Sequence, residues 1–152
     1  MASPLLSRIT SPLAIGLLAI AALVTIVSCA NRGGGVAEVP SYFDKELSLD
    51  DALAQAALED KVVVAVTTAD WCAPCQTYKR GTLVDSRVAS WITTNAVPVY
   101  IDADLQKDAV QTLGVRGFPT TTILNEGRVI QQLEGNITAD LLLSALSSAA
   151  ES

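Results

Sequence analysis

Two cysteines three positions apart, Cys72 and Cys75, constrain this chain more than any other feature. A run of mostly β-branched residues at 62–67 leads into them and helix-compatible residues follow, which predicts a strand, a turn and a helix in succession. This context places the first sulfur at a helix N-terminus, where unpaired N–H groups and the helix dipole stabilise a thiolate. Because the second sulfur lies about one helical turn further on, the pair can close a disulfide. The stretch therefore predicts a reversible dithiol/disulfide switch, with Pro74 in the first helical turn, where a missing N–H is tolerated.

The composition narrows the possible chemistry. The 152-residue chain has no histidine, which excludes a histidine general base, a histidine metal ligand and a Ser/His/Asp triad. Its three cysteines are too few for a disulfide-dense scaffold. The formal net charge of −6, with acidic residues spread along the chain, argues against a nucleic-acid partner. Dithiol exchange needs no metal and no organic cofactor, so we expect none.

Residues 1–29 have the pattern of a targeting segment. Arg8 precedes an apolar run at 12–27, and Ile26-Val27-Ser28-Cys29 resembles a bacterial lipobox, in which the cysteine is lipidated after cleavage. We therefore predict lipidation of Cys29. An uncleaved signal anchor, ordinary secretion and a chance cysteine at the end of an apolar helix stay open as alternatives. The leading readings place the domain outside the cytoplasm, on the periplasmic side, and attach it to the membrane.

Residues 30–37 contain three consecutive glycines and are predicted to form a flexible tether. The remaining residues, 38–152, form the predicted domain. Ser48 is expected to cap a helix that ends near Asp60, and Gly81 to interrupt the helix after the cysteines. Residues 97–101 are predicted to form a second central strand, and Asp102 or Asp104 to cap a short helix.

The C-terminal part of the chain predicts a hairpin and a last helix. Strands are expected at 120–124 and 128–134, joined by a turn at 125–127. Thr138 is expected to cap the last helix. Apolar residues at helical spacing predict its buried side: Leu141, Leu142, Ala145, Leu146 and Ala149. The same spacing predicts that Val84, Val88, Trp91 and Ile92 form one apolar stripe.

Three of these stretches together resemble the thioredoxin superfamily: Trp71 to Cys75, the segment 114–120 that contains Phe118-Pro119, and the hairpin turn at 125–127. The resemblance covers residues 38–150 and the order of the elements matches as well. It implies an α/β thioredoxin fold with a central mixed β-sheet flanked by helices on both faces. Within the superfamily, residues 69–72 and 78–83 are similar to the periplasmic thioredoxin-like domain of the thiol:disulfide interchange protein DsbD.

The resemblance also implies roles for single residues. Cys72 is the attacking cysteine and Cys75 the resolving one. Pro119 is the family's cis-proline, which lies against the dithiol and presents backbone to an extended substrate. Trp71, Pro74 and Phe118 line the rim where the substrate packs, although partial core burial is the alternative for Trp71 and Phe118.

One position departs from the family pattern. Thioredoxins carry a buried aspartate six residues before the first cysteine, and this chain has Val66 there. We hypothesise that resolution by Cys75 uses water instead and is slower near neutral pH than in an ordinary thioredoxin. Faster resolution of a mixed disulfide in Val66→Asp, measured by stopped flow, would support this hypothesis, and an unchanged rate would count against it.

The sequence thus predicts an extracytoplasmic, membrane-tethered protein-disulfide reductase. Its expected partners are disulfide-containing protein substrates and a membrane electron donor. A reducing direction is favoured because Ala73-Pro74 offers no histidine to stabilise the thiolate, and because Asp70, if it lies close, opposes the formation of a thiolate. Two alternatives from other classes are a Cu(I)- or zinc-binding module, for which the chain offers few ligands, and an adaptor whose dithiol is incidental.

Overall fold

The computed structural model describes residues 35–150. Its compact unit begins at Val36. The predicted targeting segment, Cys29 and most of the predicted tether therefore lie outside the described residues. Within 35–150, no helix combines the length and the apolar character needed to cross a membrane.

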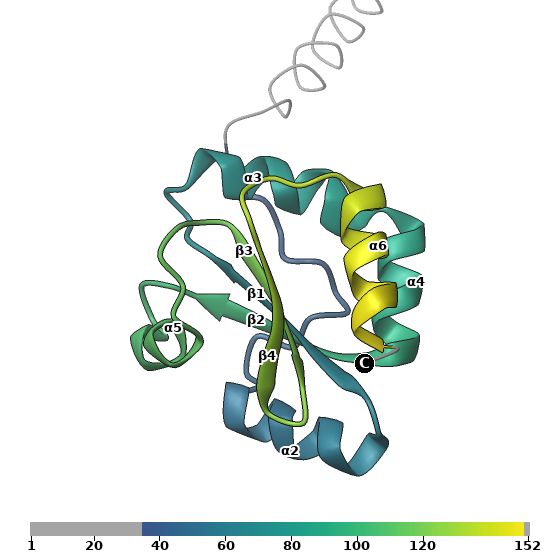
Figure 1. Ribbon diagram of the computed structural model, residues 1–152. Helices are drawn as coiled ribbons and strands as arrows, with labels where there is room; N and C mark the ends of the chain where they lie inside the picture. The colour runs from purple at the N-terminus through teal and green to yellow at the C-terminus, as the bar shows by residue number, and fades with distance from the viewer. Residues whose placement is uncertain (1–34, 151–152) are drawn as a thin grey trace, which may run out of the picture. The chain divides into compact units, whose positions relative to one another are not determined.

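A mixed four-stranded sheet forms the centre of the domain (Figure 1). Its strands are β1 (Val62–Thr68), β2 (Ala96–Asp102), β3 (Thr120–Asn125) and β4 (Arg128–Glu134), in the order β2-β1-β3-β4. β1 runs parallel to β2 and antiparallel to β3, and β3 and β4 form an antiparallel hairpin. Every residue of β1 is buried, as expected for an apolar strand covered on both faces.

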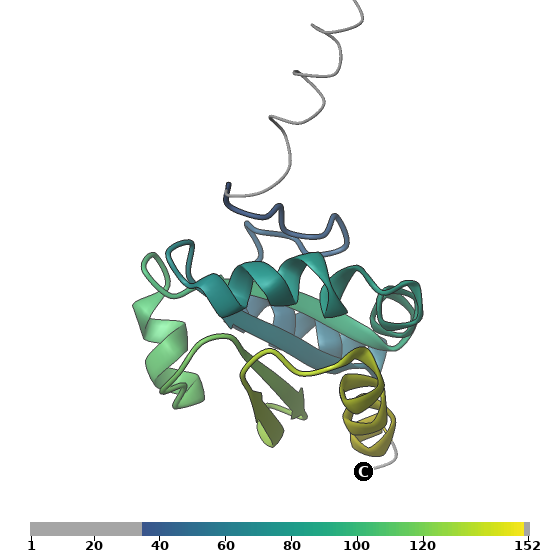
Figure 2. The ribbon, with the colours of Figure 1, turned by 90° about the horizontal axis from the view of Figure 1, so that it is seen from above.

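Helices cover both faces of the sheet. Alternate residues of β1 face a core formed with α3 (Ala73–Arg80), the 3₁₀ turn η1 (Thr82–Val84), α4 (Ser86–Asn95) and α6 (Ala139–Ala150). The intervening residues face α2 (Leu49–Glu59) and α5 (Lys107–Leu113). Figures 1 and 2 show α5 on one side of the sheet and α4 and α6 on the other. The predicted α/β thioredoxin fold is confirmed.

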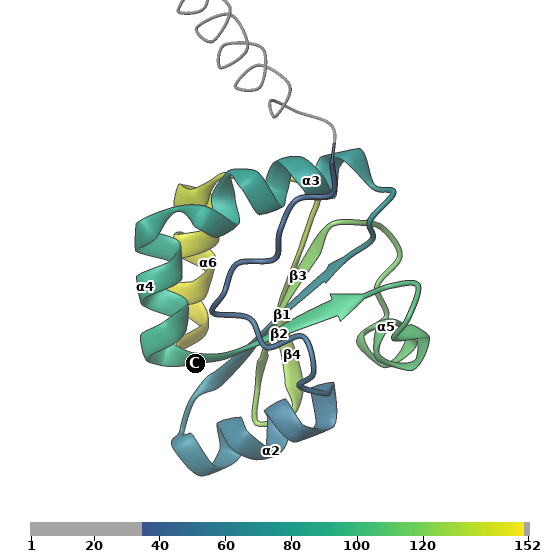
Figure 3. The same cartoon turned by 180° about the vertical axis from the view of Figure 1, so that it is seen from behind.

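The strand predicted at 97–101 is confirmed as β2, but its predicted central position is wrong, because β2 lies at the edge of the sheet. Beyond β2 there is an isolated bridge between Val99 and Asp44, where the segment before α2 passes along the strand (Figure 3). The edge position explains how the strand accommodates Pro98, which has no N–H to donate to a further strand. Continuous apolar character alone does not distinguish an edge strand that is covered on both faces from a central one.

Two predicted apolar faces need correction. Leu141 is 51% exposed whereas Leu142 is fully buried, since the buried arc of α6 consists of Leu142, Ala145, Leu146 and Ala149. Leu141, the residue before that arc, points to solvent. Val84 is also exposed, because α3 ends at Arg80 with Gly81 as its C-cap, and Val84 belongs to the separate turn η1 rather than to α4.

Most predicted ends of the elements are confirmed. Ser48 caps α2, and Thr138 accepts a hydrogen bond from the backbone N–H of Leu141 at 3.3 Å. Glu126 and Gly127 have φ of 49° and 75°, which makes the hairpin a tight two-residue turn. The capping prediction for α5 is wrong: its N-cap is Gln106, which makes no side-chain capping bond. Asp102 accepts instead from the Asp104 N–H, within the preceding turn.

Candidate active site

The cysteine pair lies where β1 turns into α3, as the sequence predicts. Cys72 is the N-cap of α3, and its sulfur accepts a hydrogen bond from the Cys75 N–H at 3.2 Å. The two sulfurs are 2.10 Å apart and form a disulfide. Both cysteines are buried, whereas Pro74 is exposed in the first turn of the helix. When the disulfide opens, the N-cap sulfur is the one placed to carry negative charge.

The loop before β3 lies against this disulfide. The Phe118–Pro119 peptide bond is cis, as the resemblance implies. β3 starts at Thr120, which pairs with Thr67 near the end of β1, so the loop reaches the same end of the sheet as the cysteines. Phe118 packs against the cluster that contains Cys72 and Cys75. Two segments more than forty residues apart in the chain thus meet at the disulfide.

Trp71 lies at the surface beside the disulfide and does not belong to the core. Its side chain is 70% exposed, which removes partial core burial as its role. The indole lies edge-on to the Phe118 ring, with ring centroids 6.0 Å apart, and its Nε1 donates to Asp104 Oδ2 at 2.9 Å. Phe118 itself is half-buried, which agrees with partial core burial, and its place at a substrate rim stays a prediction. The site therefore presents a fixed aromatic surface beside a buried disulfide.

Val66, which replaces the buried aspartate of thioredoxins, is itself fully buried in the apolar core. Its neighbours across the sheet are Tyr100 on β2 and Thr121 on β3. The Tyr78 hydroxyl of α3 hydrogen-bonds to Thr121 Oγ1 at 2.7 Å, and burial raises the pKa of Tyr78 to about 12. Neutral hydroxyl groups therefore border the place where thioredoxins have a carboxylate.

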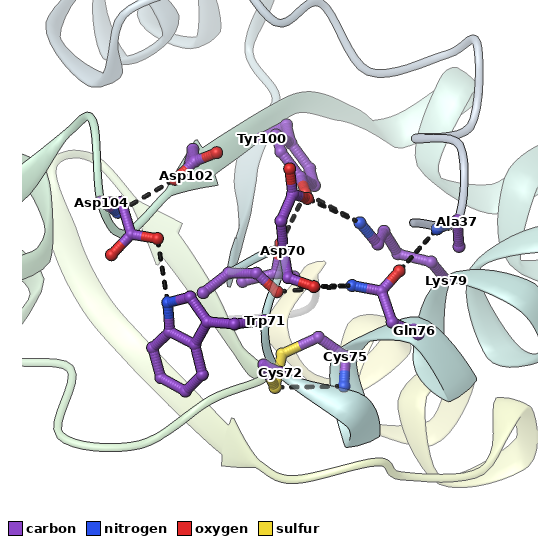
Figure 4. A network of polar contacts seen from close by, with 12 residues as sticks. Ala37, Asp70, Trp71, Cys72, Cys75, Gln76, Lys79, Tyr100, Asp102 and Asp104 are labelled. Carbon is purple, nitrogen blue, oxygen red and sulfur yellow. Dashed lines mark hydrogen bonds and ion pairs between the residues drawn. A yellow bond between two sulfur atoms is a disulfide. The ribbon is translucent and has the colours of Figure 1, made fainter. Parts of the chain in front are cut away.

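The structure adds a residue that the sequence analysis missed. The Lys79 side chain is buried, with its Nζ 3.6 Å from Asp70 Oδ1 and 3.4 Å from the Tyr100 hydroxyl (Figure 4). The Tyr100 hydroxyl also hydrogen-bonds to Thr68 at the end of β1. The available signal was position: Lys79 follows Cys75 by four residues, and residues at that spacing share one face of a helix.

Gln76 fixes the loop that leads into Cys72. Its Nε2 donates to the carbonyl of Asp70 at 2.9 Å and lies 3.4 Å from the carbonyl of Ala69. Its Oε1 accepts from the backbone N–H of Ala37 at 2.6 Å (Figure 4). The first residues of the domain are therefore attached directly beside the disulfide.

Comparison with known proteins agrees with this geometry. A family model described as a thioredoxin-like domain matches residues 49–150, which include every element from α2 to α6. The chain belongs to the thioredoxin-like domain family. This thioredoxin-like domain is similar in structure to a thioredoxin from Nicotiana alata, with 23% identity, a TM-score of 0.61 and coverage of 76% of this chain and 98% of that one.

A thioredoxin variant from Halobacterium salinarum is 28% identical to the thioredoxin-like chain, with a TM-score of 0.56 and coverage of 79% of this chain and 98% of the other. Protein disulfide-isomerase like 2-2 from Arabidopsis thaliana is 39% identical over 67 residues. The match spans 44% of this chain and 14% of the plant protein, so the chain corresponds to a small part of that relative.

Proposed function

We propose that this protein is a thiol-disulfide oxidoreductase that reduces protein disulfides outside the cytoplasm while attached to the membrane. The observation that supports it most is the Cys72–Cys75 disulfide at the N-terminus of α3, with Phe118 packed against it and a cis bond before Pro119. The cysteines supply the reactive sulfurs. The exposed Trp71 and Pro74 and the half-buried Phe118 supply the surface for an extended substrate, and the buried Pro119 presents its backbone to that substrate.

The reaction is a pair of thiol–disulfide exchanges. The Cys72 thiolate attacks one sulfur of a substrate disulfide, that bond breaks, and the other substrate sulfur leaves and takes a proton. Cys75 then loses its proton and attacks the Cys72 sulfur, which releases the second substrate sulfur. The substrate has gained two electrons and two protons, and the protein holds the Cys72–Cys75 disulfide. These steps use only the side chains of this protein and its substrate.

Two observations favour the reducing direction. No histidine lies between the cysteines to stabilise the thiolate, and the Asp70 carboxylate precedes Cys72 by two residues. A reductase outside the cytoplasm needs electrons from elsewhere, so we propose a membrane protein as the donor. A tether raises the effective concentration of the domain near such a donor.

A trapping experiment can identify the substrates and the electron donor. Cys75→Ala leaves the attacking sulfur but cannot resolve the mixed disulfide, so covalent adducts are expected to accumulate in cells. We expect these adducts to contain disulfide-bonded substrates and a membrane protein, linked through Cys72 and released by dithiothreitol. The Cys72→Ser/Cys75→Ala double variant is the matched control and should yield none. Equal adduct patterns in both variants would contradict the proposal.

Attachment to the membrane is tested separately at Cys29. We expect mass spectrometry of the mature protein to find an acylated Cys29 as the first residue. A mature protein that retains unacylated residues upstream of Cys29 would contradict lipidation, and membrane extraction would then decide between a signal anchor and secretion.

A further inference from the structure

Lys79 has an unusual environment for a charged residue. It is 1% exposed, whereas lysine is rarely buried unless it is paired. Its ion-pair partner, Asp70, belongs to the loop that leads into Cys72, and Asp70 keeps 58% of its side chain exposed. The ammonium group is thus shielded from solvent, while the carboxylate beside it is partly hydrated.

The same environment connects Lys79 to the disulfide. Lys79 and the fully buried Cys75 lie on one face of α3, four residues apart. The Tyr100 hydroxyl joins the Lys79 amine to Thr68, at the end of the strand that leads to the cysteines. A positive charge on the helix face that carries a buried thiol favours the thiolate, and little water screens it because the Lys79 side chain is buried. The apolar Val66 adds no negative charge to offset it.

We propose that Lys79 is an electrostatic partner of the dithiol: its buried ammonium stabilises the Cys72 thiolate of the reduced state and thereby sets the reduction potential of the protein. Asp70 opposes this effect in part, so the reduction potential depends on the difference between the stabilisation of the thiolate by Lys79 and its destabilisation by Asp70. This inference rests on the proposed function, since it concerns the same redox centre. Lys79 contacts no substrate and acts only through Cys72.

The redox step balances as follows. A dithiol donor gives up two electrons and two protons and becomes a disulfide, and the Cys72–Cys75 bond breaks. Cys75 keeps one of the protons as a thiol, Cys72 retains a negative charge as a thiolate, and the second proton passes to solvent. The charge on Cys72 exists only in the reduced state, so a nearby cation stabilises that state selectively.

Other charged groups also face this region. Lys79 lines a cleft of about 510 Å³, and the other titratable side chains along it are Lys45, Glu46, Asp70, Tyr100 and Asp102. Lys45 is exposed at the cleft, in the segment before α2. Lys45 therefore serves as a control for Lys79, because its substitution changes the net charge equally but removes only a hydrated, screened cation.

The test measures the equilibrium of the full chain with glutathione and the rate of iodoacetamide alkylation against pH. Lys79→Met is expected to favour the disulfide fivefold to tenfold, which for a two-electron couple lowers the potential by about 20 to 30 mV. The pH midpoint of Cys72 alkylation should rise by about one unit. Asp70→Asn should shift both quantities in the opposite direction, by a smaller factor because this carboxylate is hydrated. Lys45→Met should change the equilibrium less than twofold.

The paired variants keep the inference falsifiable. A lower melting temperature in Lys79→Met with an unchanged potential would mean a purely structural role and would overturn it. If Lys79→Met does not fold, Asp70→Asn provides the test, because a half-exposed side chain can be replaced without unfolding the protein. An unchanged glutathione equilibrium in Asp70→Asn, or one shifted toward the disulfide, would overturn the inference. Failure of the proposed function would look different, since the wild-type protein would then show no reversible reduction of Cys72–Cys75.

Discussion

Replacing Cys72 by serine is expected to reduce the catalysed rate of insulin reduction by dithiothreitol to the rate without protein. Cys72 is the N-cap of α3, where the positive end of the helix favours a thiolate, and a serine hydroxyl does not form a disulfide. Precipitation of the insulin B chain measures the rate. Cys75→Ser should behave differently, because the first attack is preserved and an adduct with insulin should form.

Thr77→Ala is the matched control for this series. Thr77 lies on the exposed side of α3, and among residues 35–150 its hydroxyl bonds only to the carbonyl of Ala73 within the same helix. Its rate should equal that of the unchanged protein. Full activity in Cys72→Ser would place the reactive thiol elsewhere in the chain.

The second large effect concerns stability. Leu142→Ala is expected to lower the free energy of unfolding by about 2 to 5 kcal/mol, because it leaves a cavity where α6 packs against the sheet. Leu141→Ala removes the same atoms from the neighbouring position, which is exposed, and should change that free energy by about 0.5 kcal/mol or less. Urea unfolding of the oxidised protein, followed by tryptophan fluorescence, measures both.

This pair tests the face that α6 buries, where the sequence pattern alone included both leucines. Equal losses of stability in the two variants would mean that α6 packs in a different rotation. A loss only in Leu141→Ala would contradict the packing directly.

Several elements could be predicted because their signals are local. A β-branched run, a cysteine at a helix start, Gly114 at a helix end and a Glu126-Gly127 turn each specify backbone conformation within a few residues. The cis state of the Phe118–Pro119 bond was a prediction of the family resemblance, since residue preferences alone favour trans.

The errors arose where tertiary contacts decide. β2 lies at the edge because β3, which comes later in the chain, pairs with the other side of β1 and not with β2. The burial of Lys79 depends on Tyr100 and Asp70, twenty-one and nine positions away. A lysine on a short helix is ordinarily hydrated, so the spacing to Cys75 placed Lys79 on the helix face of the cysteine without indicating that its amine is enclosed.

The most direct measurement of the proposed chemistry is a mass balance for a single turnover. Reduced protein is mixed with an equal amount of a disulfide-bonded peptide, quenched with acid and analysed by mass spectrometry. We predict that the protein loses the mass of two hydrogens through formation of the Cys72–Cys75 disulfide, while the peptide gains the same mass. We also predict that Cys75→Ala stops as a covalent adduct at Cys72. A peptide that stays oxidised while the protein stays reduced, or an adduct at any other residue, would contradict dithiol exchange at this site.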